Sequence, residues 1–203
     1  QYLEGLSNES KAIYKSALSS FFNFLIKDGY LTKNPVSPLK RIKQNKTKFL
    51  KSIPEHDEVL RMIEKTDNIR NKLIIEFYYV TGLRSEEGLS LKFSDFKVKG
   101  DWAYFTVVGK GSKTRKGKIT SDLFNRIKAL QPEAKQNTYL FTQERRQKGK
   151  PLSYTGLYEL IKKAGINAGL QKNVSPHSLR HAHATQSLKN GAPLKTLQNT
   201  LGH

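Results

Sequence analysis

The chain has 203 residues, enough for one large domain or for a medium and a small one together, and its 36 Lys and Arg against 17 Asp and Glu give a formal net charge of +19. A small domain needs a net charge of only about 2–8 for solubility, so the excess indicates a polyanionic partner; nucleic acid is favoured, although charge alone does not separate DNA from RNA or anionic lipid. Cysteine is absent and no apolar run reaches the roughly 18–20 residues that cross a bilayer, which excludes disulfide frameworks and cysteine-ligated zinc and predicts a cytoplasmic protein without a membrane span.

Residues 7–28 have the pattern of one amphipathic helix. Ser7 or Asn8 is placed to cap its first turn, and Gly29 ends it before the turn signal at Asn34 and Pro35. The apolar positions recur at helical spacing, at Tyr14, Leu18, Phe21, Phe22 and Leu25. Because a single helix of this length does not fold alone, residues 1–39 are predicted to be part of a small helical unit.

Residues 40–52 are predicted to be a basic linker between two units. Residues 40–51 contain six Lys or Arg and no acid, with little periodicity. A basic tether between two units is well placed to follow a phosphate backbone, although a solvated loop explains the charges equally well. The residues predicted to bind DNA here are Lys40, Arg41, Lys43, Lys46 and Lys48.

Residues 53–203 are predicted to form a second unit that is mainly α with a small antiparallel β-sheet, an α+β fold. Residues 71–80 are apolar almost all round, which indicates a buried helix that Gly82 ends just before Arg84. Residues 101–108 are aromatic and β-branched, and the turn at 109–112 predicts that residues 115–120 pair back against them. Further helices are expected at 54–65, 85–92, 153–169, 176–189 and 193–201, with one more short strand at 139–141.

Three segments of this unit carry residues suited to chemistry, at 81–84, 109–111 and 175–181. Arg84 follows the end of a buried helix, where an arginine either caps the helix carbonyls or binds a ligand. His177 and Arg180 stand three residues apart on one face of a first helical turn. Because unpaired N–H groups and the helix dipole favour an anion at such a place, this spacing predicts a phosphate site.

No metal site is predicted, although four of the five histidines fall within the last 27 residues. His177 and His181 are spaced like a ligand pair, but zinc needs a third ligand and the helix at 176–189 contains no acid. The glycine-rich segment at 109–118 is not a P-loop, because its spacing is one residue too long and Ile119 occupies the Ser/Thr position. No cofactor is therefore expected.

Four segments, in this order, make the chain resemble the tyrosine recombinases, the family of phage and transposon integrases and chromosome-dimer resolvases. They are Thr81-Gly82-Leu83-Arg84 with Glu87 three residues on, residues 108–115 (VGKGSKTR), residues 175–181 (SPHSLRH), and Leu201-Gly202-His203. Residues 1–39 resemble the second half of the family's helical core-binding domain, and residues 53–203 resemble its catalytic domain.

The resemblance implies that Arg84 and Arg180 grip the scissile phosphate. Guanidinium forks match phosphate oxygens and stabilise the charge of the transition state without a metal. In the same scheme Lys110 is the general acid that protonates the leaving 5′ oxygen, His177 assists proton transfer at the nucleophile, and His203 hydrogen-bonds a phosphate oxygen.

Lys113 and Arg115, in the same hairpin, are expected to bind DNA. Lys113 remains an alternative to Lys110 as the acid, because residues 116–118 interrupt the usual apolar strand and leave the hairpin register open. Gly88 stands where the family has an apolar residue, at a cost of about 1 kcal/mol in a helix relative to alanine.

The family's nucleophile is a tyrosine shortly beyond the position of His203, and none of the nine tyrosines present fits that place. The chain is therefore expected to hold no nucleophile and to form no covalent DNA adduct alone. The implied activity of the complete protein is site-specific recombination: tyrosine attacks a DNA phosphate, leaves a 3′-phosphotyrosyl link and a free 5′-OH, and a partner strand is rejoined without ATP.

The expected partner is double-stranded DNA, bound by a homotetramer of the complete protein in the nucleoid of a prokaryote, phage or mobile element. A type IB topoisomerase has similar catalytic groups, and a DNA-binding remnant would keep the fold without catalysis, so both remain alternatives. A general RNA-binding protein fits the charge but not the ordered arginine, lysine and histidine set.

Overall fold

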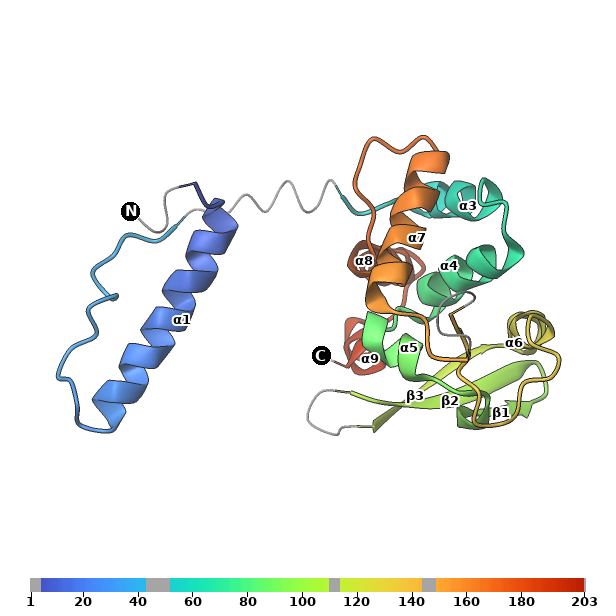
Figure 1. Cartoon of the computed structure of the whole chain (residues 1–203), viewed down its shortest axis with the longest axis horizontal. Coiled ribbons are helices and arrows are strands. Elements are labelled where there is room, and N and C mark those ends of the chain that lie inside the picture. The colour runs from blue at the N-terminus through green and yellow to red at the C-terminus, as the bar shows by residue number, and fades with distance from the viewer. Residues whose placement is uncertain (1–4, 43–51, 110–113, 144–148, 203) are drawn as a thin grey trace. The chain divides into compact units, whose positions relative to one another are not determined.

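The computed structural model describes residues 5–42, 52–109, 114–143 and 149–202 (Figure 1). The chain divides into two compact units, residues 1–50 and 51–203. None of the described helices is both long and apolar enough to cross a membrane.

The first unit consists of helix α1 (Asn8–Lys27) and the segment that follows it. The Ser7 side chain accepts a hydrogen bond from the Ser10 N–H and caps the first turn, as predicted. The segment after the helix is tied back to it, because the Asn34 amide donates to Asn23 Oδ1 at 2.7 Å and to the Ser19 carbonyl at 3.1 Å. No residue of α1 is buried. Within the described residues of this unit, the predicted apolar face of the helix is therefore not covered.

The second unit is mainly helical with one small sheet, which confirms the predicted fold class. Its helices are α3 (His56–Glu64), α4 (Ile69–Thr81), α5 (Ser85–Ser90), the 3₁₀ turn η1 (Phe93–Asp95), α6 (Ser121–Ala129), α7 (Tyr154–Asn167), α8 (Pro176–Lys189) and α9 (Leu194–Leu201). Its strands are β1 (Phe96–Lys99), β2 (Trp102–Val108) and β3 (Thr114–Thr120), which pair antiparallel in the order β1-β2-β3. In Figure 1 the helices α3, α4, α7 and α8 lie above this sheet.

The hairpin formed by β2 and β3 confirms the predicted pairing and sets its register. Val108 lies opposite Thr114 and Tyr104 opposite Lys118. Only alternate residues of β2 are buried, so one face of the sheet packs on the helices. Strand β1 and helix α6 were not predicted from the sequence.

The prediction of a short strand at 139–141 is wrong. Residue Tyr139 forms an isolated bridge with Lys92, and the next bridge joins Thr142 to Pro151. The chain is therefore extended here, but neighbouring residues pair with different segments and no continuous ladder forms.

Helix α4 lies at the centre of the core. The side chains of Ile74, Ile75 and Phe77 are fully buried, and those of Leu73 and Tyr78 are 1% exposed, which confirms a helix that is apolar almost all round. Phe77 packs edge-on against Phe141 with ring centroids 5.3 Å apart. Because most side chains of α4 are buried, the corner at its end is a well-supported position from which the next residues project.

That corner depends on Gly82, which ends α4 in the left-handed conformation with φ of 58°. A Cβ atom here would lie 2.5 Å from His183 Cδ2 and 2.9 Å from Leu201 Cδ2. Gly82→Ala should destabilise the unit by about 3 kcal/mol or more, since backbone strain and overpacking add. Urea unfolding measures this loss.

Gly191→Ala is the matched control, because Gly191 has φ of 83° and nothing within 4 Å of its Cβ position. It should cost only the conformational part, about 1–2 kcal/mol. Equal losses for the two variants would contradict a steric role for the close approach at Gly82.

Candidate functional site

Arg84 lies just past the Gly82 corner, as the residue that caps the start of α5. Its backbone N–H donates to Glu87 Oε2 at 2.8 Å, so the first turn of α5 is closed by its own third residue. Its guanidinium donates to Glu87 Oε1 at 3.1 Å, to the Gly202 carbonyl at 3.0 Å and to the Leu201 carbonyl at 3.4 Å. The side chain is 40% exposed, and two of its five N–H groups have no partner among the described residues.

Arg180 reaches the same place from α8. Ser175 caps this helix, since its side chain accepts from the Ser178 N–H, and Pro176 stands at the first helical position, as predicted. Arg180 is 6% exposed and donates to the Gly82 carbonyl at 2.8 Å and to the Leu201 carbonyl at 2.6 Å. Burial, and next the positive charge of Arg84, lower the pKa of Arg180 to about 10, so it stays charged at pH 7.

Glu87 is the negative centre of this cluster. Its two oxygens accept from both terminal nitrogens of Arg115 at 2.6 Å, a bidentate pair that joins α5 to β3. The carboxylate side chain is 6% exposed. Burial alone would raise the pKa of Glu87, but the hydrogen bonds from Arg115 and from the Arg84 backbone hold it at about 2.

The three arginines together cap the end of α9. Arg115 Nε donates to the Thr200 carbonyl at 2.9 Å, Arg180 to that of Leu201 and Arg84 to that of Gly202. The last carbonyls of a helix lack partners within it and carry the negative end of its dipole, so cationic donors are favoured there. Segments far apart in the sequence are thereby joined into one cationic cluster, Arg84, Arg115 and Arg180 around Glu87.

His177 stands one turn before Arg180 on α8. Its Nε2 lies 3.0 Å from Nε2 of His181, with the two rings almost perpendicular. Burial, and next the charge of Arg180, lower the pKa of His177, so its imidazole is neutral at pH 7. No group of three or more metal-ligating residues occurs within the ranges that the structure describes.

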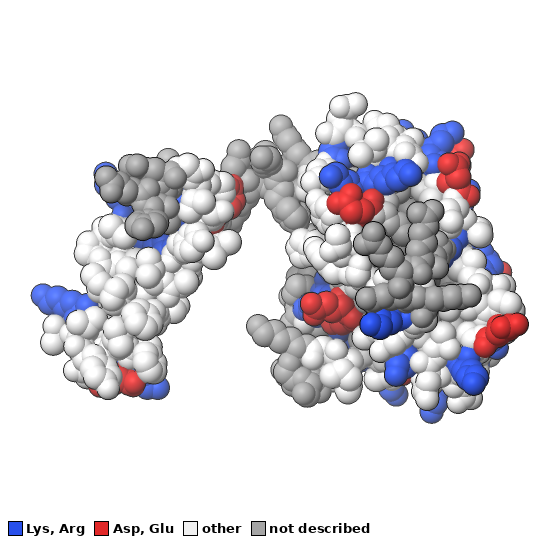
Figure 2. Space-filling model, in the orientation of Figure 1, with Lys and Arg blue, Asp and Glu red and all other residues white. Residues whose placement is uncertain are grey.

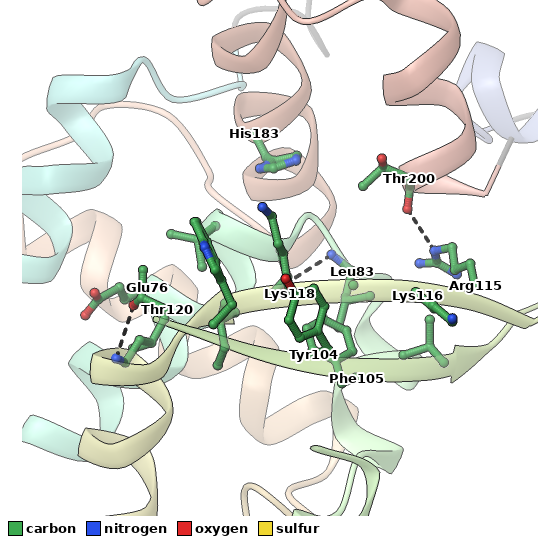
Figure 3. A pocket seen from close by; sticks show the side chains of 17 residues that line it. Glu76, Leu83, Tyr104, Phe105, Arg115, Lys116, Lys118, Thr120, His183 and Thr200 are labelled. Atoms are coloured by element: carbon green, nitrogen blue, oxygen red, sulfur yellow. Dashed lines mark hydrogen bonds between the residues drawn. The ribbon is translucent and has the colours of Figure 1, made fainter. Parts of the chain in front are cut away.

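A cavity of about 710 Å³ opens beside Arg84 and Glu87, between α5, the end of β2 and Tyr154 of α7. A second cavity of about 670 Å³ lies between β2, β3, α4, α8 and α9 (Figure 3). In that view the Lys118 side chain rises from the sheet, with His183 above it. The Nζ of Lys118 lies 3.8 Å from the centre of the Trp102 ring. Of these two cavities, the first is lined by Arg84 and Glu87 and the second by Arg115, so they meet the cluster from different sides; the partly exposed Arg84 lines the first.

The structure brings together Arg84, Arg180 and, on the same helix as Arg180, His177. Lys40 and Arg41 are exposed in the first unit. Arg115 is also described and lies against Glu87. Six further predicted residues lie outside the described residues: Lys110, His203, Lys43, Lys46, Lys48 and Lys113.

Sequence reasoning missed the pairing of Glu87 with Arg115. Glu87 was part of a motif without a role, and Arg115 was predicted as a DNA contact, whereas the structure buries it to 12% side-chain exposure against Glu87. The available signal was the position of Glu87, an acid at the third residue of the helix that follows Arg84, in a set of segments otherwise rich in cations.

Comparisons with known proteins agree on one family for this chain. Residues 53–203 match the phage integrase family. The chain is 31% identical to the tyrosine recombinase XerD of Staphylococcus epidermidis, covering 98% of the chain and 69% of that protein, and 32% identical to the one of Staphylococcus aureus, covering 98% and 70%.

Solved structures show the same likeness. A XerH site-specific recombinase bound to palindromic difH substrate in a post-cleavage complex matches with a TM-score of 0.82 and 26% identity, over 100% of this chain and 62% of that one. A lambda integrase dimer bound to a COC′ core site shares the fold, with a TM-score of 0.72 and 21% identity over 97% and 72% of the two chains.

Proposed function

The chain belongs to the phage integrase family of tyrosine recombinases, and from this premise we propose that the whole protein carries out site-specific DNA recombination by breaking and rejoining DNA strands. The chain spans 62% of the XerH chain, so the activity is proposed for the whole protein. The observation that carries it is the convergence of Arg84 and Arg180 on the Leu201 carbonyl from two separate helices.

The chemistry of this convergence suits a phosphodiester. Two guanidinium groups that share one acceptor oxygen have the reach to share a phosphate, whose oxygens accept from the same kind of N–H donors. Their positive charge stabilises most strongly the pentacoordinate transition state, in which the phosphate gains negative charge. The donors are already in position, so no rearrangement is needed at that moment. Arg180 is fixed by burial, whereas the Arg84 side chain is 40% exposed.

The proton transfers are assigned to residues around this pair. The neutral His177 has the protonation state needed to accept the proton of an attacking tyrosine hydroxyl as the oxygen–phosphorus bond forms. Lys110 would give a proton to the departing 5′ oxygen, and His203 would hydrogen-bond a phosphate oxygen. The product is a 3′-phosphotyrosyl link, whose reversal by a 5′-OH of a partner strand needs no cofactor.

We also propose a role for each part of the chain. Residues 1–39 belong to a core-binding domain, residues 40–52 to a basic linker and residues 53–203 to the catalytic domain. Lys40 and Arg41 contact the DNA backbone, whereas Arg115 orients Glu87. The structural neighbours include recombinases on DNA and a lambda integrase tetramer on a Holliday junction, which supports duplex DNA as partner and a tetramer as the working assembly.

Charge alone does not locate the DNA interface. Figure 2 shows basic side chains spread over the visible face of the second unit, with acidic ones between them. The arginine cluster, rather than the general charge, therefore carries the assignment. No observation favours a type IB topoisomerase over a recombinase.

The test is the salt dependence of binding to duplex DNA of mixed sequence. Arg84→Ala should make the slope of log affinity against log salt shallower by about 0.9, the value for one lost phosphate contact. Arg126→Ala is the matched control, since Arg126 is similarly exposed but pairs with Glu76 at 3.0 Å on another part of the unit. If the two variants give the same slope, Arg84 does not hold a phosphate.

A further inference from the structure

Gly88 and Tyr78 fit together where α5 packs on α4. A Cβ atom on Gly88 would lie 2.6 Å from the Tyr78 hydroxyl oxygen, 2.7 Å from Cζ and 2.8 Å from Cε1. All three distances are well inside van der Waals contact, so the tip of the phenol occupies the space of the missing side chain. The ring cannot move aside easily, because Tyr78 is 1% exposed and packs edge-on against Phe77 in the core.

The hydroxyl of Tyr78 also makes a directed contact with α5. It donates to the backbone carbonyl of Ser85 at 2.9 Å. Burial, and next the negative charge of nearby Glu87, raise the pKa of Tyr78 above its ordinary value, so the phenol remains a donor. Tyr78 thus holds α5 at two points, the Ser85 carbonyl and the Gly88 backbone.

Each of these two points is next to a residue that builds the arginine cluster, Ser85 to Arg84 and Gly88 to Glu87. Helix α5 has six residues, too few to be stable without tertiary contacts. Arg84 caps its start, Ser85 is its first residue, and Glu87 stands directly before Gly88. A shift of α5 would therefore move the Arg84 backbone and the carboxylate that binds Arg115.

We propose that Tyr78 is a positioning residue for the phosphate-binding arginines, and that Gly88 is the complementary residue that lets its ring approach. The phosphate role of Arg84 rests on the proposed function, whereas the positioning of α5 by Tyr78 does not. The apolar residue expected at position 88 is replaced here by the ring of Tyr78, which adds a hydrogen bond that an aliphatic side chain cannot make. Gly88 is thus a requirement of this packing rather than a defect of α5.

The first test follows the cluster itself by NMR. Tyr78→Phe keeps the ring and removes the donor, and should shift the Nε–H signal of Arg115, which reports its bond to Thr200. Tyr79→Phe is the matched control on the same helix, because its hydroxyl lies 2.9 Å from His56 Nδ1 and not near α5. An Arg115 signal that responds to neither variant, or equally to both, overturns the positioning role.

The second test measures affinity for duplex DNA of mixed sequence at fixed salt. Tyr78→Phe should weaken binding about threefold and Gly88→Ala about tenfold, in the range of one lost hydrogen bond and of a displaced contact. Tyr78→Leu combined with Gly88→Ala should reduce the loss from about tenfold to the roughly threefold loss of Tyr78→Phe, because the smaller side chain leaves room for the Cβ but lacks the hydroxyl. Failure of this rescue in a folded double variant would overturn the complementarity of the pair.

The Arg84→Ala background separates the two proposals. If Tyr78 acts through Arg84, Tyr78→Phe should weaken binding no further once Arg84 is absent. A full threefold loss in that background means that Tyr78 does not act through Arg84. If instead Arg84→Ala alone binds DNA like the wild type while the Arg115 signal still responds to Tyr78→Phe, the proposed phosphate role fails and the positioning of α5 stands.

Discussion

Glu87→Ala should destabilise the second unit by about 3–5 kcal/mol, the cost of removing one partner from a buried ion pair. The carboxylate is 6% exposed and accepts from Arg84 and twice from Arg115. Its loss leaves Arg84 and Arg115 without the carboxylate with which both pair, close to the buried Arg180. Since whole domains are stable by about 5–15 kcal/mol, urea unfolding should show a large shift of the midpoint.

The matched control is Glu76→Ala, which breaks the pair of Glu76 with Arg126 on the surface. Those side chains are 25% and 42% exposed, so the loss should stay below about 1 kcal/mol. Acid gives a second signature: because the pKa of Glu87 is about 2 in the folded state, its contribution is present above its ordinary pKa of 4.5 and is lost as the pH falls toward 2. Equal losses for the two variants, with the same acid profile, would contradict a central role for Glu87.

The sequence predicts elements best where the local pattern is unambiguous. Residues 71–80 are apolar almost all round and become part of the buried helix α4, and residues 115–120 pair back against residues 101–108 as predicted. Strand β1 is missed because only Phe96 of its four residues is buried, which leaves no alternation to detect. Helix α6 is missed because Thr120 is both the last residue of β3 and the cap of α6, so no loop separates them.

The site residues also differ in how far a local sequence pattern predicts them. Arg84, His177 and Arg180 are predictable because each stands at the end or start of a helix within a short motif. The pair of Glu87 with Arg115 spans 28 residues and exists only once the hairpin register is set, so no local pattern contains it. The contact of Tyr78 with Gly88 is similar: sequence alone shows a glycine that weakens a helix, and packing shows what fills the space.

Arg84→Lys should separate catalysis from binding in the whole protein, assayed on a duplex that carries its own recombination site. Lysine keeps the charge, so affinity for DNA should stay within about threefold of the wild type. It loses the planar fork that contacts two acceptors at once, and strand cleavage should fall by about 10²–10³, as when one preorganised donor is removed from a transition state. Arg180→Lys would be a poorer test, because the 6% exposed Arg180 also holds two backbone carbonyls.

Arg126→Lys is the control for the exchange itself, and should leave both affinity and cleavage unchanged, since Arg126 lies outside the cluster. If cleavage survives Arg84→Lys, Arg84 supplies only charge. That result would contradict a catalytic role for the planar guanidinium. A wild-type protein that binds its site without cleaving it would identify a DNA-binding remnant. Parallel loss of affinity and cleavage would instead show that lysine displaces α5, because Arg84 also contacts Glu87 and the end of α9.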